Sequence, residues 1–395
     1  MTAPAFPATT VPWPDTDRGD RFHAWVAPLV EPLRLRVDTL ALASSDAGFR
    51  RYLRIATADG GTLIVMDDPA SPNQVASFLK VGALMAERGL HVPRMLAHDA
   101  GLGFALMEDL GTSSYIAALL EAQRAGDEER PRALMRDATA ALLRWQSSEA
   151  ARADGALPLF DEAFVRRELQ IFVDWCVQAH HGKQWNEKQQ GWWDRTVTLL
   201  ASNIAAQPRV PMHRDYMPRN LMICPAIEAT AAAVAGPGET PGAASFPTPG
   251  ILDFQDAVMG PITYDIASLL RDAFISWEEA EELDWAVRYW EGAKRAGLFG
   301  TDPADPSGED PHEMALDFGL FWRRLEWTVL QRQLKIMGIF CRLKHRDGKP
   351  HYAEDLPRFY AYVVKTATRY VELSPLLRLI EDLQPQFTQT GFTLR

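Results

Sequence analysis

The sequence predicts an α+β protein of two lobes, in which a small antiparallel sheet precedes a larger, mainly helical part. Three strand-like stretches come first, TLALAS, FRRYLRIAT and TLIVMDD, and the turn ADGG joins the second to the third as a hairpin. A helix over about 73–88 ends at Gly89, and a second hairpin then pairs RMLAHD with FALMED. Beyond residue 112 the apolar residues recur mainly at helical spacing.

The expected division of the chain is a disordered leader over 1–20, a first lobe over 21–110 and a second lobe over 111–395. A short helix over 21–37, broken by Pro28 and Pro32, is expected at the start of the first lobe. In the second lobe, LMIC and GILDF are expected to pair as a hairpin, with the Ala-, Gly- and Pro-rich segment 225–249 between them as a mobile surface insertion. The helices of this lobe are expected over 112–123, 131–146, 161–179, 186–204 and from residue 264 onward.

Composition argues against several kinds of partner. The 395 residues have a formal net charge of −11, and without a broad basic face the chain is a poor candidate for nucleic-acid binding. No apolar, uncharged stretch reaches about 18 residues, so no membrane span is expected. Three widely spaced cysteines and an N-terminus without a secretion signal favour the reducing cytoplasm.

The octet HRDYMPRN, residues 213–220, places Asp215 five positions before Asn220. That spacing is typical of a kinase catalytic loop, where the aspartate accepts the proton of an attacking hydroxyl and the asparagine binds magnesium. Downstream, Asp253 follows the apolar strand GIL, where a phosphotransferase needs its second magnesium ligand. Taken singly, each motif also fits a charged turn. In this order, behind a β-rich lobe, the motifs indicate phosphoryl transfer.

These motifs resemble those of the aminoglycoside phosphotransferase-like branch of the protein-kinase fold, and the similarity extends from about residue 44 to the last helices. The resemblance implies a two-lobed kinase fold that uses ATP and Mg²⁺. It further implies that Asp215 is the catalytic base and that Asn220 and Asp253 bind the metal. Asp265, at a helix start, is expected to be a cap that holds the catalytic loop rather than a catalyst.

The resemblance makes the first lobe the nucleotide-binding lobe and the second lobe the catalytic and substrate-binding lobe. MEDLG, residues 107–111, is similar to the hinge whose backbone meets the adenine edge, with Glu108 and Leu110 as the contacts. The alternative interpretation of MEDLG is a strand that ends in a polar turn. Other nucleotide contacts are implied in SSDAGFRRYLRI, at Ser45, Gly48, Phe49, Arg50 and Arg51.

A lysine is missing from the third strand. Kinases of this fold place a lysine there to bind the ATP phosphates, but TLIVMDDP has Met66 at the aligned position. A compensating cation is therefore expected, and we predict that Arg50 or Arg51 supplies it, with Lys80 as the rival donor. The alternative is that magnesium alone suffices and the arginines are solvated.

The stretches DFQDAVMGPITYDIASLLRDAF and LQRQLKIMGIF resemble a narrower group, the anomeric sugar kinases of bacterial cell-wall recycling. That resemblance implies phosphorylation of the anomeric hydroxyl of N-acetylmuramate or N-acetylglucosamine to the α-1-phosphate. The expected substrate-binding residues are Asp215, Arg219, Gln255 and Asp256. Arg219 equally fits a solvated face, and Asp256 equally fits a turn that it closes. A sugar acid would also favour basic residues near the base, and Arg219, Arg323 and Arg332 are available.

Two other functions remain open from the sequence. The first is a different small-molecule kinase, acting on an aminoglycoside, choline or homoserine. The second is a catalytically inactive nucleotide-binding scaffold, which the presence of both metal-ligand candidates and the base disfavours. In every case the expected partner is a small molecule and the expected protein is a monomer.

Overall fold

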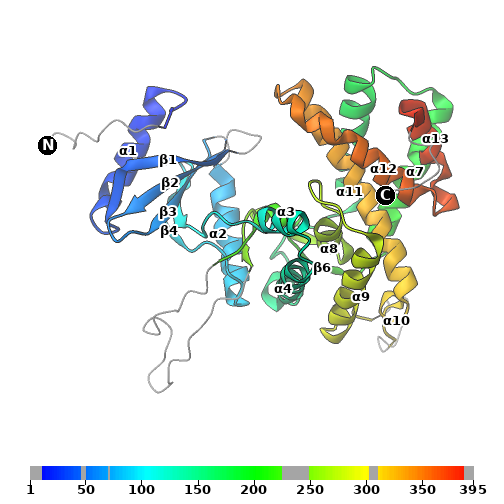
Figure 1. The fold of residues 1–395 in the computed structure, drawn as a ribbon, viewed down its shortest axis with the longest axis horizontal. Coiled ribbons are helices and arrows are strands. Elements are labelled where there is room, and N and C mark those ends of the chain that lie inside the picture. The colour runs from blue at the N-terminus through cyan, green and yellow to red at the C-terminus, as the bar shows by residue number, and fades with distance from the viewer. Residues whose placement is uncertain (1–10, 46–49, 70–71, 225–248, 302–309, 387–395) are drawn as a thin grey trace. The chain divides into compact units, whose positions relative to one another are not determined.

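The structure, a computed structural model, describes residues 11–45, 50–69, 72–224, 249–301 and 310–386 (Figure 1). The chain forms two compact units. Unit 1 comprises Met1–Ala118 and Arg219–Asp256, and unit 2 comprises Leu119–Pro218 and Ala257–Arg395. This division differs from the boundary expected at residue 110, because the chain returns to the first unit at Arg219. Asn220 and Asp253 therefore belong with the sheet, whereas Asp215 belongs to the helical unit.

Unit 1 contains the predicted small antiparallel sheet, whose five strands have the order β1-β2-β3-β5-β4. Both predicted hairpins are confirmed: β2 pairs with β3 from Arg51 opposite Asp67 to Ala56 opposite Thr62, and β4 pairs with β5. The strands are β1 (Leu35–Ser45), β2 (Arg51–Thr57), β3 (Thr62–Asp67), β4 (Met95–Asp99) and β5 (Phe104–Glu108).

Helix α1 (Thr16–Val30) begins inside the segment that was expected to be a disordered leader. Its first turn is capped by Asp15, which accepts a hydrogen bond from the backbone N–H of Arg18. Phe22 and Val26, four residues apart on one face, are fully buried in the core against β1, β2, β3 and β5. The leader prediction was wrong for residues 16–20, where Asp15 caps the helix and Arg18 pairs with buried Asp67. The helix expected over 21–37 ends at Val30, and residues 35–37 belong to β1.

The strand pair that ends at Asp253 also lies in unit 1. β7 (Leu221–Met222) pairs with β8 (Gly250–Ile251) as predicted, and residues 225–248 of the predicted insertion lie outside the described residues. After β8, Phe254 is fully buried and packs on Phe78 of α2 (Pro72–Glu87), with ring centroids 4.5 Å apart. A Cβ on Gly82, one turn further along α2, would lie 3.3 Å from the Phe254 ring.

Unit 2 is built mainly of helices, with one short two-stranded sheet of β6 (Arg209–Met212) and β9 (Val258–Pro261). The predicted helix over 161–179 is α6 (Glu162–Ile171) continued by a π-helix, η1 (Phe172–His180). The long α11 (Phe318–His345) lies in the core of the unit and contacts most of its neighbours. The other helices are α3 (Tyr115–Ala125, which starts in unit 1), α4 (Glu129–Gln146), α5 (Glu149–Arg152), α7 (Glu187–Ala205), α8 (Thr263–Leu270), α9 (Glu279–Arg295), α10 (Glu313–Leu316), α12 (Leu356–Ala367) and α13 (Ser374–Leu383), with short 3-10 turns at η2 (Pro218–Asn220), η3 (Pro350–Asp355) and η4 (Val371–Leu373). Across the described ranges, none of the helices combines the length and the apolar character needed to cross a bilayer.

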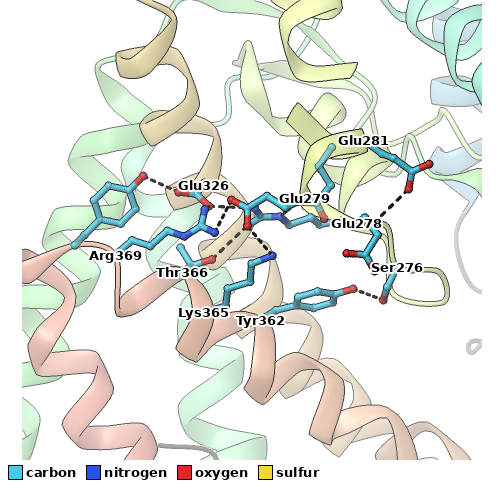
Figure 2. A network of polar contacts seen from close by, with 12 residues as sticks. Ser276, Glu278, Glu279, Glu281, Glu326, Tyr362, Lys365, Thr366 and Arg369 are labelled. Carbon is cyan, nitrogen blue, oxygen red and sulfur yellow. Dashed lines mark hydrogen bonds and ion pairs between the residues drawn. The ribbon is translucent and has the colours of Figure 1, made fainter. Parts of the chain in front are cut away.

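A buried ionic network fixes α11 against its neighbours (Figure 2). The guanidinium of Arg271, just after α8, lies 3.0 Å from both Glu282 of α9 and Glu326 of α11. Arg369, just after α12, bridges Glu326 to Glu279 of α9. Moving α11 away would separate Glu326 from Arg271 and leave buried charges without a partner. Losing one partner of a buried pair costs about 3–5 kcal/mol, so this network holds α11 in place. The same helix provides Arg332 and Lys335 to the site described below.

Candidate active site

The catalytic-loop motif follows β6 in unit 2, and a buried carboxylate holds it. Asp265, in the first turn of α8, accepts hydrogen bonds from the backbone N–H of His213 at 2.7 Å and of Arg214 at 3.0 Å. Arg214 has a φ of 77°, a left-handed conformation that a non-glycine residue rarely adopts without support. The two bonds supply that support. Asp265 thus holds the loop, as the sequence predicted, but it is not the cap of α8, whose N-cap residue is Ile262.

The carboxyl of Asp215 is kept ionised by its neighbours. Burial alone would raise its pKa, but the positive charges of Lys335, Arg332 and Arg214 outweigh burial and hold the pKa below the ordinary value. The backbone N–H of Asp215 donates to Nδ1 of His213 at 3.3 Å, which fixes the carboxylate's position in the loop. An ionised, positioned carboxylate is what a general base requires.

Beside this base lies a cluster of charged side chains from α6, the catalytic loop and α11. Its members are the carboxylate Glu168 and the cations Arg214, Arg332 and Lys335. The ammonium of Lys335 lies 2.7 Å from Glu168 and 3.2 Å from the hydroxyl of Tyr264. Arg214 lies 3.3 Å from the same carboxylate, and Arg332 donates to the carbonyl of Arg214 at 3.0 Å. Three positively charged side chains therefore lie near two carboxylates, those of Glu168 and of the base Asp215.

The two metal-ligand candidates meet in unit 1. The side-chain amide of Asn220, at the end of η2, lies 3.4 Å from Oδ2 of Asp253, and the carbonyl of Asn220 accepts the backbone N–H of Leu252 at 2.9 Å. Asp253 has a φ of 62°, so the backbone turns sharply as it leaves β8. The atom in contact is the amide nitrogen of Asn220, which donates to the carboxylate. The oxygen of the same amide and the carboxylate of Asp253 are ligands of the kind that Mg²⁺ takes, since it binds few protein oxygens and completes its shell with phosphate and water.

Oδ1 of Asp253 is held by two donors of the same unit. Arg50 donates from Nη2 at 3.1 Å, and the side-chain amide of Gln255 donates at 2.9 Å. Gln255 is itself fixed, since it is almost fully buried and its backbone carbonyl accepts a hydrogen bond from the hydroxyl of Ser77 on α2. The structure therefore places Gln255 beside Asp253, although the sequence assigned it to the sugar.

The arginines expected to replace the missing lysine have different surroundings. Met66 is buried in β3, and the neighbouring carboxylate of Asp67 is paired with both Arg18 and Arg51. Arg51 also donates to the carbonyl of Pro12 at 2.6 Å, so its guanidinium is engaged in holding the N-terminal segment. Arg50 instead lies at Asp253. Of the two arginines, the structure places Arg50 alone beside a metal-ligand candidate.

The hinge segment after β5 is fixed by ion pairs of its side chains. Oε1 of Glu108 lies 3.6 Å from Nε2 of His91, and Cys224 and Glu108 together raise the pKa of His91 to about 9. The next residue, Asp109, accepts hydrogen bonds from Arg54 at 3.0 Å and from Thr62 at 2.7 Å. The backbone is also engaged: the N–H of Glu108 donates to the carbonyl of Arg94 at 2.9 Å, and the carbonyl of Leu110 accepts from the thiol of Cys224. The assignment of Glu108 and Leu110 to adenine therefore stays a prediction.

The remaining predicted site residues divide into two groups. Gly48, Phe49 and the side chain of Ser45 lie outside the described residues, so their assignment to nucleotide stays a prediction. Arg219 and Asp256 are exposed, both in unit 1. Sequence reasoning missed Glu168 and Lys335 entirely.

The site and fold define a kinase-like phosphotransferase, and comparison with known proteins agrees. The model of the "Phosphotransferase enzyme family" matches residues 39–230 and 247–306. The chain belongs to this family.

Curated relatives cover most of the chain. An N-acetylmuramate/N-acetylglucosamine kinase of Neisseria meningitidis serogroup B is 39% identical over 355 residues, which are 90% of this chain and 93% of that protein. A kinase of the same name from Pseudomonas aeruginosa is 41% identical over 341 residues, 86% of this chain and 87% of that protein.

Solved structures with low sequence identity share the fold. The gentamicin complex of APH(2'')-IIa has a TM-score of 0.54 at 10% identity and covers 92% of this chain and 99% of that chain. The ADP-bound aminoglycoside phosphotransferase APH(2'')-Ib has a TM-score of 0.52 at 11% identity, covering 87% of this chain and 96% of that chain. The two-lobed, protein-kinase-like fold predicted from the sequence is confirmed.

Proposed function

We propose that this protein is an ATP-dependent kinase that phosphorylates the anomeric hydroxyl of N-acetylmuramate and N-acetylglucosamine, giving the α-1-phosphates. The observation that carries the proposal is the identity of 39% and 41% to two relatives of that name over most of the chain. Such a product would serve the reuse of cell-wall sugars, the role that the resemblance implies. The protein would act in the cytoplasm as a monomer.

Asp215 acts as the base in the proposed reaction. Its ionised carboxylate accepts the proton of the anomeric hydroxyl as that oxygen attacks the γ-phosphorus of ATP, and the bond to the β,γ-bridging oxygen breaks. An anomeric hydroxyl is more acidic than other sugar hydroxyls, so a carboxylate with a lowered pKa suffices when its position is fixed. The bond network of His213 and Asp265 provides the fixed position.

Asn220 and Asp253 hold magnesium, which when bound neutralises the charge of the phosphate oxygens. Arg50, already in contact with Asp253, is the cation that binds the phosphates in place of the third-strand lysine. The hinge at Glu108 and Leu110 binds the adenine. Ser45, Gly48 and Phe49 complete the nucleotide site, and Arg219 and Asp256 contact the sugar.

The proposal has a direct biochemical test. We expect Mg²⁺-ATP to raise the melting temperature of the protein, because a ligand that binds only the folded state stabilises it. We also expect ATP to be consumed when either amino sugar is added. Consumption only with an aminoglycoside, choline or homoserine would favour another small-molecule kinase. Binding of ATP without turnover on any acceptor would favour the inactive scaffold.

A further inference from the structure

Lys335 is a buried lysine to which the proposed chemistry assigns no contact with a substrate; so far it acts only through its charge, which helps to lower the pKa of Asp215. Its side chain is 12% exposed, and its ammonium contacts Glu168 at 2.7 Å and the Tyr264 hydroxyl at 3.2 Å. An ammonium has three N–H donors, and among the described residues only these two acceptors are in reach. A donor thus remains for a ligand.

Arg332, one turn before Lys335 on α11, is placed in the same way. Its Nη1 donates to the carbonyl of Arg214 at 3.0 Å, and its guanidinium lies 4.5 Å from the centre of the Tyr264 ring. Its other two nitrogens donate to no group in the described part of the chain. Tyr264 therefore contacts both cations, and because they are three positions apart on α11 they project from the same face of that helix.

The charges around the base are unfavourable for a cationic acceptor. Lys335, Arg332 and Arg214 contribute three positive charges, and Glu168 and Asp215 contribute two negative charges that their neighbours keep ionised. Two further buried carboxyls interact with Arg332, and burial raises the pKa of both: that of Asp265 rises to about 7, so it is charged only in part at neutral pH, and that of Asp272 is raised as well. A cluster with this balance attracts an anion.

We propose that Lys335 and Arg332 bind the carboxylate of an acidic sugar whose anomeric hydroxyl is presented to Asp215. This inference rests on the proposed function and specifies its substrate class. The lactyl carboxylate of N-acetylmuramate is such a group, and N-acetylglucosamine lacks it. The cluster therefore selects the sugar acid over the neutral sugar, through a charge-assisted hydrogen bond from each cation.

The test compares three acceptors: N-acetylmuramate, its neutral methyl ester, and N-acetylglucosamine. Lys335→Met is expected to raise KM for N-acetylmuramate about 10- to 100-fold, the usual worth of a hydrogen bond to a charged group. The KM values for the ester and for N-acetylglucosamine are expected to change by less than about threefold. Lys335→Arg, which restores a cation, is expected to recover most of the preference for the acid.

Two controls keep the test decisive. Since Lys335→Met leaves Glu168 buried without its lysine, the double variant Lys335→Met with Glu168→Gln is assayed in parallel, with melting temperatures for each. Arg323, which the sequence offered as another cation for the sugar acid, instead pairs with exposed Glu372. Arg323→Ala therefore serves as the control on the same helix and should leave all three KM values unchanged.

The outcomes separate the two proposals. If the parent enzyme phosphorylates none of the three acceptors, the proposed function fails. If the parent is active, and both Lys335→Met and the double variant raise KM for all three acceptors equally, the cations act on the phosphoryl group or on the fold. The inference is then overturned. Unchanged KM for N-acetylmuramate in both variants overturns it as well.

Discussion

Arg50 donates to the carboxylate of Asp253 at 3.1 Å, although 203 positions separate the two residues in the chain. In kinases of this fold a lysine of the third strand binds the phosphates. Here β3 has Met66, and the arginine before β2 reaches the metal-ligand candidate itself. Both groups lie in unit 1, so the contact is internal to that unit.

The first prediction concerns this arginine. Arg50→Ala should raise KM for ATP about 10- to 100-fold, because a cation that binds phosphate is lost. Arg51→Ala should lower the melting temperature through Asp67 and leave KM for ATP within about twofold. Lys80→Ala tests the alternative cation, a lysine on the exposed side of α2. A larger effect in Lys80→Ala than in Arg50→Ala would contradict the assignment, and no effect in any of the three would rule out a replaced lysine.

The second prediction concerns the base. Asp215→Asn should lower kcat by several orders of magnitude, about 10²–10⁴-fold for the loss of general base catalysis. The affinity for ATP, measured by calorimetry, should stay close to that of the parent because the base acts on the acceptor. Turnover near the parent rate would show that another group accepts the proton.

The third prediction concerns the residue that holds the loop. Asp265→Asn replaces one acceptor with an amide that faces a backbone N–H, so the free energy of unfolding should fall by roughly 2 kcal/mol. Chemical denaturation measures this change. Glu291→Gln, at an exposed pair on α9, is the matched control and should shift stability by less than about 0.5 kcal/mol. Equal stability of Asp265→Asn and the parent would mean that the two bonds do not hold the loop.

Much of the fold could be predicted because its signals are local. Strand alternation, the turn ADGG and the spacing of HRDYMPRN each depend on neighbouring residues, and the structure contains the predicted sheet and both hairpins. The start of α1 was missed, since what fixes it includes the pair of Arg18 with buried Asp67, 49 positions away, which forms only in the folded unit.

The parts of the site that could not be predicted depend on distant contacts. Glu168 and Lys335 are 167 positions apart and belong to two helices whose faces meet only in the folded unit. Sequence alone offers no signal that pairs them. Likewise, the sequence offered Arg50 and Arg51 as alternatives, and only the structure identifies Asp253 and Asp67 as their partners.

The fourth prediction is a pH dependence of stability. The pKa of His91 is raised from an ordinary 6.5 to about 9, so the folded protein binds more protons than the unfolded chain between these values. The resulting stabilisation is fully present below about pH 6.5 and is lost as pH rises through about 9. After allowance for solvent screening it amounts to roughly 1–2 kcal/mol.

His91→Asn should remove that part of the pH dependence, as seen in melting temperatures measured from pH 6 to pH 10. His98→Asn replaces an exposed histidine of β4 and serves as the control, so its curve should follow the parent. A parent curve and a His91→Asn curve that fall in parallel would exclude the raised pKa of His91, caused by Cys224 and Glu108, as the source of the pH dependence.

The identity of the product is the most direct test of the central claim, that this protein phosphorylates an amino sugar at its anomeric hydroxyl. The parent enzyme is incubated with Mg²⁺-ATP and N-acetylmuramate or N-acetylglucosamine, and the product is examined by phosphorus NMR. We predict an acid-labile phosphate whose phosphorus signal is split by the anomeric proton, and no such product from Asp215→Asn. A 6-phosphate, or activity confined to aminoglycosides, would contradict the account.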